Sequence, residues 1–371
     1  MPTAIDLFAG AGGATQGLRD AGFDVVGAVE IDADAAATWQ LNHPGTMLVQ
    51  DVRTLSGADL LAAVGLGPGE LDLLKACPPC QGFSSLRGGR AVDETRNDLV
   101  LDTLRLVEEL APKAVLLENV PGLRRDARFS SLLAGMRELG YLVQDYVVEA
   151  SLLGVPQRRR RLVVIAVRGA TTLPEDLDTL VPSGARRHSM TAGEALTRLA
   201  AVQRADDPIH IWRRASDTVG RRIAAVPVNG NRFDLPPDLQ LACHTKMIGS
   251  TGRPVRSATG SYGRVRAAEP APTMTTRCTT PACGSFIHPT ENRGLSLREA
   301  AALQTFPADY AWFGSYGSVE KQIGNAVPVW MAEALGRAAL RLLDSHVEAR
   351  GGAVGVVQVE LTEFPRLART A

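Results

Sequence analysis

The chain has 371 residues, 45% hydrophobic and 22% charged with a net charge of zero, which is typical of a globular protein with a sizeable apolar core. It has no run of about 18 apolar residues and no charged region before an apolar N-terminal stretch, so we expect no transmembrane helix and no signal peptide. Its five cysteines, an odd number, argue against a secreted disulfide scaffold and favour the cytoplasm.

The first 168 residues alternate short apolar runs with stretches of helical periodicity. We predict strands over residues 3–8, 23–30, 46–51, 71–76, 113–120 and 160–167. We predict helices over residues 14–22, 32–43, 99–110 and 129–140. Strands separated by helices of this length predict an α/β fold with a doubly wound, mostly parallel sheet.

From about residue 170 this alternation ends. Residues 170–292 are rich in Pro, Gly, Arg and Thr, and only 188–202 has helical spacing. Helical spacing returns at 296–307 and 327–345, and we expect the second of these helices to pack back on the sheet. We therefore predict one domain of residues 1–169 plus about 318–345, an irregular domain of about 170–317, and a C-terminal extension, 346–371, with one strand-like run, VGVVQVEL.

The charges are unevenly distributed along the chain. Residues 151–266 contain 19 Lys and Arg against 9 Asp and Glu, whereas the rest contains 21 against 31. A basic segment in an otherwise acidic chain is typical of a protein that presents one surface to a polyanion. The alternative is a compositional bias towards arginine, since only four of the 40 basic residues are lysine, but such a bias would spread the arginines evenly.

A glycine-rich turn, GAGG, separates the first predicted strand from the first helix. Gly10, Gly12 and Gly13 permit unusual backbone angles and a close approach to a ligand. Glu30 ends the second strand and Asp51 the third, where carboxylates suit a ribose and an adenine amino group. No lysine or arginine flanks the turn, so a cofactor with adenosine but no pyrophosphate, such as S-adenosylmethionine, fits best. The alternative is a tight turn with surface acids.

Cys77 and Cys80 bracket two prolines in KACPPCQGFSS. As zinc ligands they would need two more, and the candidates Cys243, His244, Cys278 and Cys283 form no second close pair. As a redox pair they have thioredoxin-like spacing but follow the fourth strand rather than the first. As a nucleophile, Cys80 lies just beyond a strand end, on the side expected for the cofactor, in a turn stiffened by proline. We favour this third reading.

Two further strand ends carry ionisable groups. Glu118 lies in LLENV, at the end of the fifth strand. Arg159 and Arg161, in VPQRRRRLVVIAV, begin another strand, and alternate residues of a strand face the same side. A run of arginines is ordinarily a solvated surface, but this run leads into a buried apolar strand. We therefore expect these groups to share a cleft with Cys80.

The motifs described above, taken in their order along the chain, resemble those of the DNA (cytosine-5) methyltransferases. The combination of PPCQ, ENV and the QxRxR spacing is the most specific part. The matching stretches are DLFAGAGG (6–13), the acids Glu30 and Asp51, PPCQGFS (78–84), RNDL (96–99), ENV (118–120), QRRRR (157–161), RGLSLREAAALQTFP (293–307) and GNAVP (324–328). The resemblance implies a Rossmann-like S-adenosylmethionine-dependent catalytic domain. It also implies a target-recognition domain at about 170–317, and that Cys77 is a bystander.

The resemblance further implies covalent catalysis, because cytosine C5 is not nucleophilic enough to take a methyl group directly. The Cys80 thiolate would attack C6, protonated Glu118 would hydrogen-bond N3, and Arg159 and Arg161 would hold the base. C5 then takes the methyl group of S-adenosylmethionine. The cytosine must be flipped out of double-stranded DNA, whose phosphates the basic segment would bind. Residues implied to position the substrate are Gln81, Ser84, Asn119 and Gln157.

The resemblance also implies a set of cofactor contacts and partners. Ile31 stands where some members carry an aromatic residue, so stacking on adenine should be weaker. We expect no metal, and a monomer in the bacterial cytoplasm, associated with the nucleoid and not with a membrane. Partners are double-stranded DNA and a cognate restriction endonuclease or defence system. The implied cofactor residues are Phe8, Ala9, Gly10, Gly12, Gly13, Glu30, Ile31, Asp51, Val52, Pro79, Leu99 and Asn325.

Two alternatives remain open. A tRNA cytosine-5 methyltransferase has the same fold, but that branch shows a different pattern beside its cysteine motif and a less extended recognition region. A catalytically silent DNA-binding partner would be free to lose Cys80, Glu118 and the arginines, all of which are present. The sequence identifies neither the recognition site nor the base that removes the C5 proton.

Overall fold

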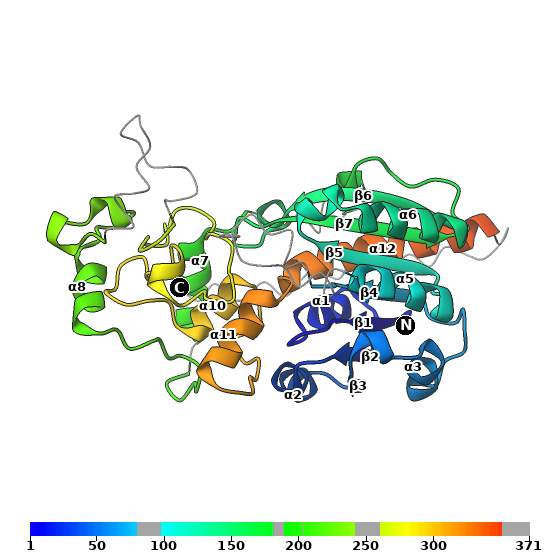
Figure 1. Ribbon diagram of the computed structural model, residues 1–371, viewed down its shortest axis with the longest axis horizontal. Helices are drawn as coiled ribbons and strands as arrows, with labels where there is room; N and C mark the ends of the chain where they lie inside the picture. The colour runs from blue at the N-terminus through cyan, green and yellow to red at the C-terminus, as the bar shows by residue number, and fades with distance from the viewer. Residues whose placement is uncertain (80–97, 180, 182–188, 203, 242–259, 351–371) are drawn as a thin grey trace, which may run out of the picture.

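The computed structural model describes residues 1–79, 98–179, 181, 189–202, 204–241 and 260–350. A seven-stranded sheet with the order β3-β2-β1-β4-β5-β7-β6 forms the centre of one lobe (Figure 1). β1 to β5 pair in parallel, and β7 is antiparallel to both β5 and β6. The strands are β1 Thr3–Leu7, β2 Asp24–Glu30, β3 Thr46–Val49, β4 Leu73–Ala76, β5 Ala114–Asn119, β6 Tyr141–Glu149 and β7 Arg160–Arg168.

This sheet confirms the predicted doubly wound, mostly parallel α/β fold. Because β1 to β5 are parallel, their carboxyl ends meet at one edge of the sheet, and antiparallel β7 begins at that same edge. Leu7, Ala76 and Leu117 are aligned across β1, β4 and β5, so the residues that follow them are neighbours. We call this side of the sheet the carboxyl edge.

Helices cover both faces of the sheet. One face is packed by α1 (Gly13–Ala21) and α12 (Val329–Arg350), through Leu18, Met331 and Leu335 among others. The predicted return of the C-terminal helix to the sheet is therefore confirmed. The other face is covered by α3 (Gly57–Val64), α5 (Leu99–Leu110) and α6 (Ala127–Glu138). α2 (Ala33–Asn42) lies beside β2 and β3.

Residues from about 189 onward build a second apolar core in the other lobe, drawn from green to orange in Figure 1. Its apolar residues include Met190, Phe286, Leu303 and Ile323. The first residues of α12 also contribute to this core, so α12 packs in both lobes. The helices of this lobe are α7 Ala192–Val202, α8 Asp217–Ala225, α10 Leu297–Leu303 and α11 Tyr316–Asn325.

Some elements differ from the prediction. β6, α3, α8 and α11 were not predicted, and α10 ends at Leu303 rather than at residue 307. The helix stops there because Thr305 takes a positive φ of 61° and Pro307 follows. The strand-like run VGVVQVEL lies outside the described residues. Within the described ranges, no helix is long and apolar enough to cross a membrane.

Candidate active site at the carboxyl edge

The glycine turn after β1 has a strained backbone and one open position. Phe8 and Gly10 both have φ of 56°, which is uncommon for a residue with a side chain. A Cβ on Gly10 would meet nothing within 4 Å, whereas one on Gly12 would lie 2.5 Å from His43 Nε2. A Cβ on Gly13 would lie 2.6 Å from the carbonyl oxygen of Val327. Gly10 therefore borders open space, while Gly12 and Gly13 are needed for internal packing.

Glu30, the last residue of β2, is held by backbone amides. Its Oε2 accepts a hydrogen bond from Gly10 N at 2.8 Å. Its Oε1 accepts from Ile31 N at 2.9 Å and Asp32 N at 2.8 Å. The Ile31 side chain is 64% exposed beside this carboxylate. An oriented carboxylate, an exposed apolar side chain and the open space at Gly10 fit a nucleoside with its sugar hydroxyls.

Two residues that the sequence analysis missed, Tyr310 and His43, support this turn. The Tyr310 hydroxyl donates to Ala11 O at 2.5 Å and lies 2.8 Å from His43 Nε2. Because the tyrosine proton is given to Ala11, the histidine Nε2–H is the donor of the second bond. Burial lowers the pKa of His43 to about 4, so its ring is neutral at physiological pH. No motif marks this pair, since only the fold brings α2 and the segment after α10 together.

The other predicted cofactor residues lie around the same edge. Asp51 follows β3, and its carboxylate accepts Arg53 Nε at 3.0 and 3.1 Å and Nη2 at 2.5 Å. The Arg53 guanidinium lowers the pKa of Asp51. Ala9 and Val52 are buried, and Pro79 is half-buried. Leu99 begins α5, and Asn325 ends α11 with an exposed side chain.

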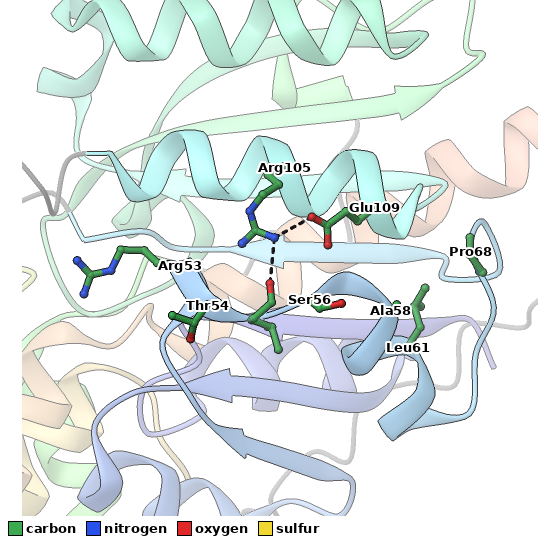
Figure 2. Close-up of a pocket in the computed structure, with 9 residues that line it drawn as sticks. Arg53, Thr54, Ser56, Ala58, Leu61, Pro68, Arg105 and Glu109 are labelled. Carbon is green, nitrogen blue, oxygen red and sulfur yellow. Dashed lines mark hydrogen bonds and ion pairs between the residues drawn. The ribbon is translucent and has the colours of Figure 1, made fainter.

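A surface depression lies between α3 and α5 (Figure 2). Its charged groups are already paired, because Arg105 Nη1 bonds Glu109 Oε1 at 2.8 Å and Leu55 O at 2.9 Å. Glu109 also accepts from Gly57 N at 2.5 Å. These contacts tie α3 to α5. The depression contains none of the predicted site residues, so we assign it no part in the site.

The centre of the carboxyl edge is the Glu118 side chain of β5, which is 4% exposed. Its Oε1 forms an ion pair with Arg161 Nε at 2.9 Å, and its Oε2 accepts from Cys77 Sγ at 2.9 Å. The next residue, Asn119, donates from Nδ2 to Pro78 O at 3.0 Å. The end of β5 therefore holds the start of the PPC segment, and its buried carboxyl group pairs with a guanidinium through one oxygen and accepts from a thiol through the other.

The predicted nucleophile, Cys80, lies outside the described residues, as do Gln81 and Ser84. The described chain reaches Pro79, one residue before Cys80. Asn119 fixes the backbone at Pro78 and Cys77 contacts Glu118, so the chain leaves β4 directly beside the Glu118 carboxyl. The roles of these three residues stay predictions.

Arg159 and Gln157 lie on the path between the two lobes. Arg159 is buried, with Nη1 3.5 Å from Met274 O, whereas Arg161 reaches Glu118. Gln157 is 0% exposed and donates from Nε2 to Gln304 Oε1 at 2.7 Å. Its Oε1 accepts from Met274 N at 2.9 Å. Gln157 thus joins the segment before β7 to two segments of the second core.

Part of the positive charge of the basic segment is internal. Arg264 is buried and donates to the carbonyl oxygens of Val226, His288, Glu291 and Ile223. Such an arginine supports the fold and cannot contact a polyanion. The exposed arginines of the described second lobe are Arg198, Arg204, Arg213, Arg214, Arg221, Arg266 and Arg277.

Among the described residues, no group of three or more His, Cys, Asp or Glu side chains could hold a metal ion. Cys278 is buried with Sγ 3.9 Å from Glu320 O, and burial raises the pKa of its thiol. Cys283 is exposed. The other two residues considered as zinc ligands, Cys243 and His244, lie outside the described ranges.

Comparison with known proteins identifies the family of this chain. The family model for C-5 cytosine-specific DNA methylases matches residues 3–341. The Type II methylase M.HgiDII of Herpetosiphon aurantiacus is 32% identical over 350 residues, which is 92% of this chain and 95% of that protein. The Type II methyltransferase M.PspPI of Psychrobacter sp. (strain TA137) is 33% identical over 349 residues, which is 92% of this chain and 79% of that protein.

Solved structures show the same architecture. A structure described as a DNA modification methyltransferase encoded within a prophage (E. coli) has a TM-score of 0.66 and 26% identity, covering 93% of this chain and 100% of that one. The Dnmt2 methyltransferase of S. pombe has a TM-score of 0.64 and 16% identity, covering 94% and 99%, and shows the fold alone. From the family match over residues 3–341, the chain belongs to the C-5 cytosine-specific DNA methylases and is a DNA (cytosine-5) methyltransferase.

Proposed function

We propose that the chain methylates C5 of a cytosine flipped out of double-stranded DNA, through a covalent bond between Cys80 and C6. The observation that carries this proposal is the buried Glu118–Arg161 pair beside the segment that leads to Cys80. A carboxyl group that contacts a fixed guanidinium can orient a polar ring edge and support charge that develops there. A nucleophile on the adjoining loop then acts on the same ring.

We propose that S-adenosyl-L-methionine occupies the open space at Gly10, where it supplies the methyl group. Glu30 would accept the ribose hydroxyls, since backbone amides already fix its orientation. Ile31 and Phe8 would contact the adenine and ribose, and Asn325 the methionine end. Asp51 would receive the adenine amino group beside its partner Arg53. Further contacts would come from Ala9, Gly12, Gly13, Val52, Pro79 and Leu99.

The roles of the catalytic side chains follow from their contacts. Protonated Glu118 would donate to cytosine N3, and Arg161 would stabilise the carboxylate that forms when the proton is transferred. Arg159 would contact the base from the side of Met274. Asn119 would hold the PPC segment through Pro78 O, and Gln157 would hold the lobes in place. Gln81 and Ser84 would position the cytosine.

We further propose that residues of about 170–317 form the target-recognition domain, with residues 1–169 and about 318–345 as the catalytic domain. Exposed arginines such as Arg214, Arg221 and Arg277 would contact DNA phosphates. We propose a monomer that works in the bacterial cytoplasm on the nucleoid, paired with a restriction endonuclease or a defence system. The curated relatives' names as Type II methylases support the first pairing.

The experiment that tests this function is expression in a bacterial host without cytosine methylation, followed by base-resolution conversion sequencing of the DNA. We expect methylated cytosines in one short shared sequence from the wild type and none from Cys80→Ala. Unmethylated DNA from soluble wild-type protein that binds S-adenosylmethionine would contradict the proposal. RNA from the same cells, sequenced in the same way, would show whether RNA is the substrate instead.

A further inference from the structure

Cys77 contacts the proposed acid of the reaction. It follows β4 directly and is half-buried against the apolar core under α1 and α12. Its Sγ lies 2.9 Å from Glu118 Oε2, while Arg161 Nε pairs with Oε1 of the same carboxyl group. A thiol is a weak donor and a carboxyl oxygen accepts, so Cys77 Sγ donates to Glu118 Oε2 in this contact.

A buried charge pair lies on the same side of β4. Lys75 is two residues before Cys77, and side chains two apart on a strand face the same way. Its Nζ forms an ion pair with Asp6 Oδ1 at 2.7 Å, and the two side chains are 3% and 0% exposed. Burial opposes the charge on Lys75, but the ion pair with Asp6 and the neighbouring Cys77 and Glu118 together outweigh this effect and raise the pKa of the lysine. Lys75 is therefore a fixed cation at this position.

The Asp6 carboxylate is itself held from α1. Thr15 Oγ1 donates to Asp6 Oδ2 at 2.7 Å and accepts from Trp39 Nε1 at 2.8 Å. The Lys75 ammonium is therefore held by this buried network and pairs with Asp6 rather than with Glu118. The groups that face the Glu118 carboxyl from neighbouring strands are then Arg161 of β7 and, from the β4 side, Lys75 and Cys77.

From this arrangement we infer that Cys77 is a positioning residue for Glu118, an inference that rests on the proposed function. In the reaction, the Cys80 thiolate bonds C6, the C5=C6 electron pair moves to C4–C5, the C4=N3 electron pair moves to N3, and N3 takes the proton of Glu118. Glu118 is left as a carboxylate. The Cys77 S–H donates to that carboxylate and holds its second oxygen, so it favours the proton transfer and fixes the plane of the carboxyl group.

The test compares Cys77→Ala with Cys77→Ser in steady-state methylation of a duplex that carries the recognition site. A hydrogen bond to a charged group is worth about tenfold in rate, so Cys77→Ala should lower kcat by about that factor with KM for DNA and cofactor within about twofold. Cys77→Ser keeps a donor and should recover kcat to within about threefold of wild type. Cys283→Ala, which removes an exposed thiol in the second lobe, is the matched control and should leave kcat unchanged.

The pH dependence of kcat separates positioning from packing. Without the thiol donor the Glu118 carboxylate is less favoured, so Cys77→Ala should move the alkaline limb of kcat to higher pH while its maximum falls. A loss of packing alone would lower kcat without moving the alkaline limb of its pH profile. In a Glu118→Gln background, Cys77→Ala should cause no further loss, because the contact no longer joins a carboxylate.

Three outcomes would overturn the inference about Cys77. These are full activity of Cys77→Ala, Cys77→Ser as slow as Cys77→Ala, and an unmoved pH limb. If the wild type is active, none of them contradicts the proposed function. An inactive wild type would instead contradict the proposed function. Thermal melts and S-adenosylmethionine binding of each variant identify a folding defect, and Cys77→Ser, which changes one atom, keeps the test decisive if Cys77→Ala fails to fold.

Discussion

Glu30 and Glu118 are two carboxylates at the same edge of one sheet, held in different ways. Glu30 accepts hydrogen bonds from the backbone amides of Gly10, Ile31 and Asp32. Glu118 is held by the side chains of Arg161 and Cys77. Backbone donors come with the shape of the turn and suit a group that must stay fixed and charged. Side-chain donors can be tuned one residue at a time, which suits a group that must give up a proton.

The largest expected effect comes from removing the proton donor. Glu118→Gln keeps the shape of the side chain but cannot transfer a proton, so kcat should fall about 10²- to 10³-fold. Binding of S-adenosylmethionine should change less than about twofold, because we propose that Glu30, and not Glu118, contacts the cofactor. Methylation rates and calorimetric binding measure the two effects. Glu138→Gln, an exposed glutamate of α6, is the control. Undiminished turnover would remove Glu118 from the mechanism.

The second effect should fall on binding rather than on chemistry. Glu30→Gln removes the charge that we propose accepts the ribose hydroxyls, so the Kd for S-adenosylmethionine should rise about tenfold. At saturating cofactor, kcat should stay within about twofold of wild type. Glu70→Gln, on an exposed turn at the opposite side of the sheet, is the control. If kcat fell and Kd did not change, the proposal that Glu30 acts in cofactor binding and Glu118 in the chemical step would be wrong.

The smallest effect on turnover is expected for His43, which supports the glycine turn through Tyr310. The pKa of His43 is lowered to about 4 by burial, below its ordinary value of 6.5. The unfolded chain therefore binds a proton that the folded chain does not, so the stability that His43 contributes is complete above pH 6.5. It should be lost as the pH falls towards 4, by up to about 3 kcal/mol.

Denaturant unfolding of wild type and His43→Gln over this pH range measures that contribution. The difference between the two curves should shrink as the pH falls, while kcat at pH 7.5 changes little. A pH-independent difference would show that His43 is not buried in its neutral form.

The order and type of the sheet's elements could be predicted because they depend on local signals. Apolar runs such as LDLLKA and KAVLLENV read as buried strands, and the glycine turn marks the first crossing from strand to helix. β6 was missed because its sequence, YLVQDYVVE, neither alternates strictly between apolar and polar residues nor forms one continuous apolar run. α11 was missed because its sequence, YGSVEKQIGN, has two glycines. The Ser315 N-cap and the burial of Val319 and Ile323 stabilise it instead.

The positions of Glu30 and Glu118 at strand ends could be predicted, whereas their roles stay predictions. Contacts between distant segments could not be predicted. Nothing in the sequence pairs His43 with Tyr310, or Gln157 with Gln304, since these bonds depend on how the second lobe packs on the first. Cys77 was read as a bystander, although its contact with Glu118 gives it a part in the proposed mechanism. The charge count of residues 151–266 also overstated the surface charge, because Arg264 is buried.

The most direct test of the central claim is to identify the atom that bonds the cytosine. A duplex carrying the recognition site, with fluorine in place of hydrogen at C5 of the target cytosine, leaves no proton to remove, so the covalent intermediate should accumulate. Mass spectrometry of the peptide that contains both thiols locates the adduct. We predict a cytosine adduct on Cys80 in the wild type and in Cys77→Ala. No adduct, or one on Cys77, would contradict the account.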